Sequence, residues 1–265
     1  MTSYRALALD VDGTLVCAAQ KKISAVTTAA LKDLQARGVV VILATGRSGF
    51  ASTGDILGTD FMPDWRVCAN GALVLDAAGS IMFERRFTIT DVDSIAAFTA
   101  RHALPLTFTF EDAYYVYSNY KEYVAYYTSH TGPVPYLRDG GDYSRHLQSL
   151  PFGAYIIKMS GGLGSELAGL CPSIKLMETY PEAYDVSPRD ADKRHGVAWV
   201  ISRLGISFEE LVAVGDSEND RGLMAAAGLS VAMANAPPHI RELAGHVTGS
   251  VQEDGAAEAI RQFFS

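Results

Sequence analysis

The apolar residues of this chain fall into short runs that alternate with helix-like patterns near both ends. Residues 4–9, 39–44 and 211–215 are continuous apolar runs, each followed by polar residues. Runs that are apolar on both faces are typical of buried parallel strands. Between the first two, residues 24–37 have apolar positions at helical spacing, after a serine that can cap a helix and before a glycine. The pattern predicts strand, helix and strand.

The C-terminal part continues this alternation. Helices are predicted over residues 193–204 and 218–227, with the strand 211–215 between them and another strand over 229–233. Strands that alternate with helices indicate βαβ units and a parallel sheet. We therefore expect an α/β core with a doubly wound, mostly parallel sheet.

The middle of the chain has a different pattern. Hairpins are predicted over residues 70–84 and 106–117, a helix over 90–102, and strands over 153–160 and 173–179 with a helix between them. This is the pattern of an α+β segment inserted into an α/β frame.

The predicted core comprises residues 1–84 and 186–265, and the inserted domain comprises residues 85–185. Linkers near 84–89 and 180–187 would act as hinges. The stretch 114–136 holds eight tyrosines. They can form a ligand-facing surface suited to sugar rings, or they can pack half-buried against strands and helices.

Composition narrows the classes of protein. The chain has 265 residues, with 48% apolar and 20% charged residues, which is ordinary for a globular protein. Its net charge of −8 disfavours sequence-independent nucleic-acid binding and docking on anionic membranes. We expect a soluble, cytoplasmic protein, because the three cysteines lie far apart, no apolar run approaches 18 residues and no secretory pattern is found.

Three predicted strands end in residues that carry chemistry: Asp10, Thr45 and Asp216. Ligands of open parallel sheets bind outside the carboxyl ends of the strands. After the first strand, Asp10 and Asp12 are two residues apart, so their carboxylates share a face of an extended chain. One can be a nucleophile and the other a proton shuttle, as in phosphoryl transfer. The alternative is a strand-to-loop turn with acidic capping residues.

The other two strand ends also allow two interpretations. The oxygen-rich segment 216–220 can bind Mg²⁺. Its acidic residues can also cap the N-terminus of a helix, and the two roles do not exclude each other. The segment 45–47 can hold a phosphate or form a capped turn. Lys193 at a predicted helix start suits a phosphate partner, although a solvated lysine is the commoner case. Asn70-Gly71 is a hairpin turn pattern that can also lie near a substrate.

Together these residues resemble the haloacid dehalogenase superfamily of phosphatases, in its Cof-type or type IIB branch. The resemblance runs the full length of the chain and implies a Rossmann-like core with an α/β cap domain (the C2B type), inserted between the second and third motifs to select the substrate. It rests on Asp10-Val11-Asp12-Gly13-Thr14, Thr45-Gly46-Arg47, Cys68-Ala69-Asn70-Gly71-Ala72, Lys193 with Gly196, and Gly215-Asp216-Ser217-Glu218-Asn219-Asp220.

The resemblance also implies a role for each motif residue. Asp10 would attack phosphorus, Asp12 would act as general acid and base, and Thr45 and Lys193 would bind phosphoryl oxygens. Mg²⁺ would be held by Asp10, the backbone carbonyl of Asp12, and Asp216, with Asp220 and Asn219 orienting its waters or the loop. The residues expected around the phosphate or the substrate are Gly13, Thr14, Thr45, Gly46, Arg47, Asn70, Lys193 and Asn219.

One motif departs from the common form of this branch. The lysine usually stands directly before a glycine, whereas here the string is Asp192-Lys193-Arg194-His195-Gly196. We place the lysine at Lys193, because a variant with two intervening residues also occurs. His195 fills the other candidate position and is expected to be a surface residue.

The expected activity is Mg²⁺-dependent hydrolysis of a small phosphomonoester, such as a sugar phosphate, through an aspartyl-phosphate on Asp10. The expected partner is that small-molecule substrate, with no nucleic acid and no membrane, and the protein is expected to be a monomer or homodimer. Two alternatives stay open: a sugar phosphomutase of the same superfamily, and a non-catalytic phosphate-binding regulatory module.

Overall fold

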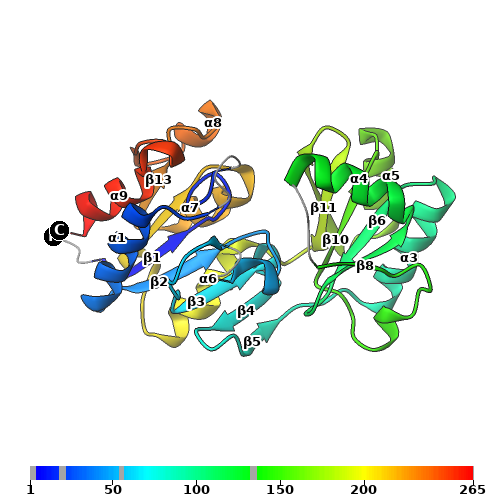
Figure 1. The fold of residues 1–265 in the computed structure, drawn as a ribbon, viewed down its shortest axis with the longest axis horizontal. Coiled ribbons are helices and arrows are strands. Elements are labelled where there is room, and N and C mark those ends of the chain that lie inside the picture. Colours follow the sequence, from blue (N-terminus) through cyan, green and yellow to red (C-terminus); the bar gives the residue numbers. More distant parts are fainter. Residues whose placement is uncertain (1–3, 18–21, 54–56, 132–135, 265) are drawn as a thin grey trace. The chain divides into compact units, whose positions relative to one another are not determined.

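The fold is described by a computed structural model, which covers residues 4–17, 22–53, 57–131 and 136–264. The chain forms two compact units (Figure 1). The core unit comprises Met1–Phe83 and Asp192–Ser265, and the inserted unit comprises Glu84–Ala191.

The core unit is built on a sheet of eight strands in the order β14-β13-β12-β1-β2-β3-β4-β5. Pairing is parallel from β14 to β3, and β3 pairs with β4 antiparallel. The predicted strands and the hairpin of β4 and β5 are present, whereas β3 and β14 had not been predicted. The strands are β1 (Ala6–Leu9), β2 (Val40–Ala44), β3 (Trp65–Cys68), β4 (Leu73–Asp76), β5 (Ile81–Glu84), β12 (Leu211–Gly215), β13 (Leu229–Ala232) and β14 (His246–Val247).

Helices cover both faces of this sheet. On one face, Leu31 and Leu34 of α1 (Ala25–Ala36) and Ile260 of α9 (Gly255–Phe263) pack in one buried cluster with residues of β1 and β2. On the other, α6 (Lys193–Arg203) and α7 (Arg221–Ala226) contribute Val197 and Leu223 to a second cluster. Successive residues of a strand point to opposite faces, so the apolar runs fill both clusters. A further short helix, α8, spans Pro238–Arg241. The predicted α/β class with a parallel sheet is confirmed.

One helix begins later than predicted. Residues 218–227 were expected to be a continuous α-helix, but Glu218–Asp220 form a 3-10 turn and α7 begins at Arg221. The side chain of Asp220 accepts hydrogen bonds from the backbone N–H groups of Asp216 and Ser217. Asp220 therefore caps this turn, as the capping interpretation of the acidic segment predicts.

The inserted unit has a six-stranded sheet in the order β10-β11-β9-β6-β7-β8. Residues of α3 (Ile89–Arg101) and α5 (Gly161–Leu170) pack on one face with Phe108 and Ile156. Tyr123 of α4 (Tyr120–Thr131) packs with Val116 and Ile157, which point to the opposite face. The strands are β6 (Leu106–Thr109), β7 (Tyr114–Ser118), β8 (Leu137–Asp139), β9 (Gly153–Ile157), β10 (Ile174–Tyr180) and β11 (Ala183–Pro188).

The second predicted boundary needs correction. We expected the domain to change after residue 185, within a linker over 180–187. Most of these residues belong instead to β11, which pairs with both β9 and β10. The change of unit lies after Ala191 instead. Residues 183–188 were not recognised as a strand, because their apolar and polar residues are mixed.

Two smaller predictions in this unit are also settled. Gly161-Gly162 were expected in a loop but begin α5. Among the tyrosines of the 114–136 stretch, Tyr117 and Tyr123 are buried in the two clusters, as the packing interpretation predicts. A ligand-facing role for the other tyrosines stays a prediction.

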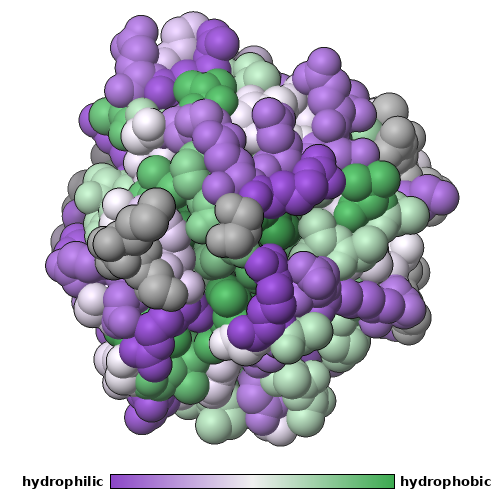
Figure 2. Space-filling view, turned by 90° about the vertical axis from the view of Figure 1, so that its left-hand side faces the viewer, coloured by the Kyte–Doolittle hydropathy of each residue, from purple (hydrophilic) through white to green (hydrophobic). Residues whose placement is uncertain are grey.

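Polar side chains cover much of the face shown in Figure 2, and apolar residues appear between them in separate groups. Most folded proteins show such a surface. Of the helices in the described residues, none has both the length and the apolar character needed to cross a bilayer.

Candidate active site

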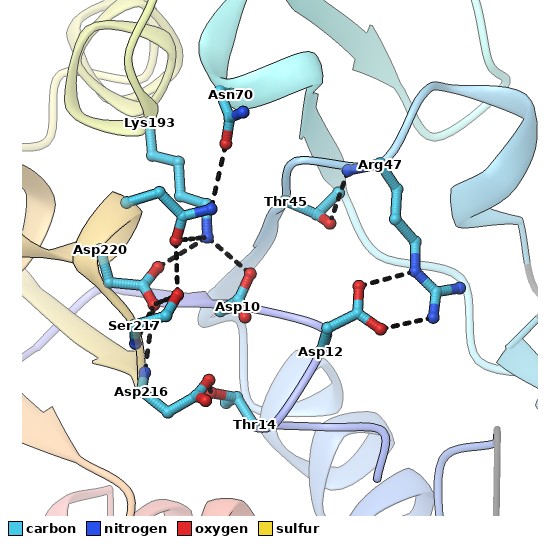
Figure 3. Close-up of polar contacts among 11 residues, drawn as sticks. Asp10, Asp12, Thr14, Thr45, Arg47, Asn70, Lys193, Asp216, Ser217 and Asp220 are labelled. Atoms are coloured by element: carbon cyan, nitrogen blue, oxygen red, sulfur yellow. Dashed lines mark hydrogen bonds and ion pairs between the residues drawn. The ribbon is translucent and has the colours of Figure 1, made fainter. Parts of the chain in front are cut away.

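Three strand ends meet at one edge of the core sheet (Figure 3). Strand β1 lies between β2 and β12 and is parallel to both. Asp10, Thr45 and Asp216 each follow directly after one of these strands. The arrangement expected from the sequence is therefore present, and the residues between β12 and α7 join it.

Lys193 is the centre of the polar network in Figure 3. Its Nζ donates to Asp10 Oδ1 at 2.6 Å, Asp220 Oδ1 at 2.7 Å and Asn219 Oδ1 at 2.9 Å. The Lys193 side chain is fully buried. Burial alone lowers the pKa of an ammonium group, but Asp10 and Asp220 outweigh it and raise the pKa of Lys193 above its usual range. Lys193 is therefore a charged, buried group, and the solvated-lysine interpretation is wrong.

His195, the other candidate for the third motif, lies outside this network. Its side chain is 57% exposed and faces Asp192, whose carboxylate accepts a hydrogen bond from the His195 backbone N–H as the N-cap of α6. The first turn of α6 thus presents Lys193 to the site and His195 to solvent.

Asp10, Asp216 and Asp220 each offer a carboxylate oxygen within 4.8 Å of the others. Burial raises the pKa of Asp10 well above its usual value, and the neighbouring carboxylates add to this while Lys193 opposes it. Burial and then the charge of Asp220 raise the pKa of Asp216 to about 6. One ammonium group faces three carboxylates, so a divalent cation would offset the remaining negative charge. Carboxylate oxygens are hard ligands of the kind that such cations take, and the residues present therefore fit a divalent metal.

Gly13 places its loop directly against Asp216. Its φ is +87°, and a Cβ added there would lie 2.1 Å from Asp216 Oδ2. The next residue, Thr14, donates from its hydroxyl to Asp216 Oδ1 at 2.9 Å. Gly13 and Thr14 were expected near the phosphate, and the structure places them against a predicted metal ligand.

The Gly13→Ala variant should need a higher metal concentration for activity, by about tenfold or more, because the methyl group displaces the Asp216 carboxylate. Titration of the activity with Mg²⁺ measures this shift. Gly38→Ala is the matched control, since Gly38 has a φ of +82° and nothing within 4 Å of an added Cβ. Both variants carry the same backbone strain, about 1 to 3 kcal/mol. An equal metal requirement in the two would contradict this contact.

Asp12 points away from the lysine network. Its carboxylate accepts two hydrogen bonds from Arg47, from Nε at 2.8 Å and from Nη2 at 2.6 Å, and its side chain is 60% exposed. Its side chain is not part of the cluster formed by Asp10, Asp216 and Asp220. The role of its backbone carbonyl as a metal ligand stays a prediction. Arg47 was expected among the phosphate-binding residues, but the structure pairs it with Asp12.

The loop after β2 and the turn after β3 complete the site. Thr45 is buried, and its Oγ1 accepts a hydrogen bond from the Arg47 backbone N–H at 3.1 Å. This hydrogen bond forms the capped turn that was one interpretation of the segment 45–47. Gly46 lies beside Asn70, because a Cβ at Gly46 would be 3.2 Å from Asn70 Oδ1. Asn70 accepts a hydrogen bond from Asn219 Nδ2 at 3.1 Å.

Asn235 supports the site from outside the motifs. Its Nδ2 donates to the backbone carbonyl of Gly13 and its Oδ1 accepts from the Val251 N–H, each at 2.9 Å. Asn235 therefore ties the loop of the first motif to the segment before α9. An exposed asparagine after a strand has no pattern that would have revealed this contact.

Comparison with known proteins identifies the family. Residues 7–260 match the haloacid dehalogenase-like hydrolases, so the chain belongs to that family. The resemblance inferred from the motifs is confirmed, and so is the expected enzyme class, a phosphatase of this superfamily.

Full-length relatives and solved structures agree. Phosphatase YwpJ of Bacillus subtilis is 26% identical, with 96% of this chain and 98% of YwpJ covered. 5-Amino-6-(5-phospho-D-ribitylamino)uracil phosphatase YcsE of the same organism is also 26% identical, with 97% and 94% covered. The structure of the subclass IIB sugar phosphatase BT4131 is similar in fold, with a TM-score of 0.84, 24% identity and 98% of each chain covered.

Proposed function

We propose that the protein hydrolyses small phosphomonoesters in a Mg²⁺-dependent reaction, with Asp10 as the nucleophile. One observation carries the proposal: the buried Asp10 carboxylate is held at 2.6 Å by a charged lysine and lies beside Asp216 and Asp220. The hydrogen bond from Lys193 fixes the orientation of the Asp10 side chain, as a nucleophile that attacks phosphorus requires.

The reaction has two displacements at phosphorus. An oxygen of Asp10 forms a bond to phosphorus while the bond to the ester oxygen breaks, and Asp12 in its acid form gives its proton to the leaving oxygen. Water then attacks the aspartyl-phosphate, Asp12 takes a proton from it, and Asp10 and inorganic phosphate are released. To transfer these protons, Asp12 must either leave Arg47 or keep only part of its hydrogen bonding with the Arg47 guanidinium.

Charge stabilisation comes from groups that are already in place. Lys193 and the hydroxyl of Thr45 bind phosphoryl oxygens, with backbone groups of Gly13 to Thr14 and of Gly46 lining the same edge. Mg²⁺ bound by Asp10, Asp216 and the carbonyl of Asp12, with Asp220 and Asn219 orienting its shell, would neutralise the charge that builds up on the transferred group. In this scheme Asp220 acts mainly by holding Lys193 and the backbone of Asp216 and Ser217.

The proposed substrates are small phosphorylated metabolites, with sugar phosphates first. Support comes from the sugar phosphatase whose fold this chain shares and from a relative named for a phosphorylated ribityl compound. We assign the choice of substrate to the inserted unit, Glu84–Ala191, because function varies most in segments grafted onto a common core.

Phosphate release tests this function. The purified protein should release phosphate from one or more compounds in a panel of sugar phosphates, nucleotides, pyridoxal phosphate, flavin mononucleotide and an aryl phosphate. Activity should vanish with a chelator and return with Mg²⁺, and Asp216→Asn should require more metal than the wild type. Isomerised hexose phosphate without free phosphate would identify a mutase instead, and binding of phosphate without turnover would identify a regulatory module.

A further inference from the structure

The turn between β3 and β4 has an unusual backbone. Ala69, Asn70 and Gly71 follow one another with φ of +47°, +52° and +92°. Residues other than glycine rarely adopt this left-handed conformation, because their Cβ crowds the following carbonyl. Such strain persists where the surroundings impose it, and it often lies at functional sites. Ala69 and Asn70 are both buried.

The surroundings of this turn are the catalytic loops. The backbone N–H of Ala69 donates to the carbonyl of Arg47 at 2.7 Å, and that of Asn70 donates to the carbonyl of Thr45 at 3.1 Å. On its other side, Gly71 lies against the residue before Lys193, since a Cβ at Gly71 would be 1.9 Å from the carbonyl oxygen of Asp192. The turn therefore contacts both the Thr45 loop and the start of α6.

The side chain of Asn70 reaches the nucleophile through two other side chains. Its Oδ1 accepts from Asn219 Nδ2, and the opposite end of that amide, Asn219 Oδ1, accepts from Lys193 and from the Ser217 hydroxyl. Lys193 in turn holds Asp10. Because an amide has a donor on one side and an acceptor on the other, the acceptor on Asn70 keeps the oxygen of Asn219 turned toward the ammonium group. A reversed amide would place its NH₂ group against Lys193.

We propose that Asn70 is a positioning residue that sets Lys193, and through it Asp10, by orienting the amide of Asn219. This role differs from the one expected for Asn70 among the residues around the phosphate or the substrate, and it rests on the proposed function. The turn requires a residue that tolerates the left-handed conformation and also offers an acceptor. Glycine meets only the first requirement, and aspartate meets both.

This difference gives a direct experiment. Asn70→Gly should lower kcat by about tenfold to a hundredfold with KM nearly unchanged, because the reacting groups are less well placed. Asn70→Asp should recover most of that loss. Neither variant should unfold, since both residues fit the backbone, and thermal unfolding of each checks this. Asp254→Gly is the control: it also replaces a polar residue by glycine, at a φ of +58° in the core unit, and its contacts are with Ser24 and Thr27, outside the network. Its kcat should stay at the wild-type value.

A double variant distinguishes orientation of Asn219 by Asn70 from contact of Asn70 with the substrate. In an Asn219→Ala background, Asn70→Gly should have little further effect on kcat, because the amide it orients is gone. The proposal is overturned if Asn70→Gly raises KM instead of lowering kcat, if it leaves kcat unchanged, or if its effect stays equally large in the Asn219→Ala background. An inactive wild-type protein would refute the proposed function itself, so phosphate release by the wild type is measured first.

Discussion

Asp10→Asn is expected to abolish turnover, with a fall in kcat of about 10⁴-fold or more, because an amide oxygen cannot form the covalent phosphoryl intermediate. The protein should still fold. Asparagine has nearly the same volume, and Lys193 keeps its contacts with Asp220 and Asn219. The free energy of unfolding should not decrease, since the change removes a buried carboxylate whose pKa is raised well above its usual value. Phosphate release and denaturant unfolding measure the two quantities.

Acid quenching during turnover adds a chemical test. The wild-type chain should carry phosphate on Asp10, detected by mass spectrometry of peptides, and the variant should carry none. Asp33→Asn is the control, because Asp33 is an exposed residue of α1 that pairs with Arg37. Turnover by Asp10→Asn within about tenfold of the wild type would contradict the assignment of the nucleophile.

Lys193→Met is expected to have the second largest effect and to act on both activity and stability. kcat should fall by about 10²- to 10³-fold, because the phosphoryl group loses a positioned cation. The free energy of unfolding at neutral pH should fall by about 3 kcal/mol, because Asp10 and Asp220 become buried carboxylates without their ammonium partner.

The loss of stability should depend on pH in a defined direction. Without Lys193, the pKa of Asp10 rises further above its unfolded value, so the native state binds protons more tightly than the unfolded chain. The destabilisation should therefore shrink as the pH falls and the carboxylates become protonated. Urea unfolding from pH 5 to 8 measures this trend.

Two controls separate the site from general effects. Lys32→Met breaks an exposed ion pair with Asp60 and should change stability little. His195→Gln alters the other candidate of the third motif, and kcat should stay near the wild-type value because His195 faces solvent. Loss of activity in His195→Gln, with activity kept in Lys193→Met, would reverse the assignment of the third motif.

The sequence predicted the parts of the fold that depend on local pattern. The apolar runs that became β1, β2 and β12 are buried on both faces, and the Ser24 hydroxyl caps α1 as expected. It also predicted that Asp10, Thr45 and Asp216 would meet, because parallel neighbouring strands end at the same edge of a sheet. Strand β11 was missed because its mixed residues give no clear period, although pairing on both edges makes it part of the sheet.

The sequence could not assign side-chain partners within the site. Arg47 was expected to bind phosphate, yet it pairs with Asp12, 35 positions earlier in the chain. Asn70 meets Asn219, which is 149 positions away. Each residue has the right chemistry for several partners, and only the packing of separate loops selects one of them.

By itself, then, the sequence determined the class of the fold, the order of the motifs and the residue types at the active edge, because hydrophobic period and strand ends are local properties. The tertiary structure decided that Lys193 is buried between Asp10 and Asp220, 183 and 27 positions away along the chain. It also decided that Gly13 touches Asp216, and that a strained turn supports the network. These contacts depend on the mutual packing of β1, β3, α6 and the loop after β12, which no local pattern encodes.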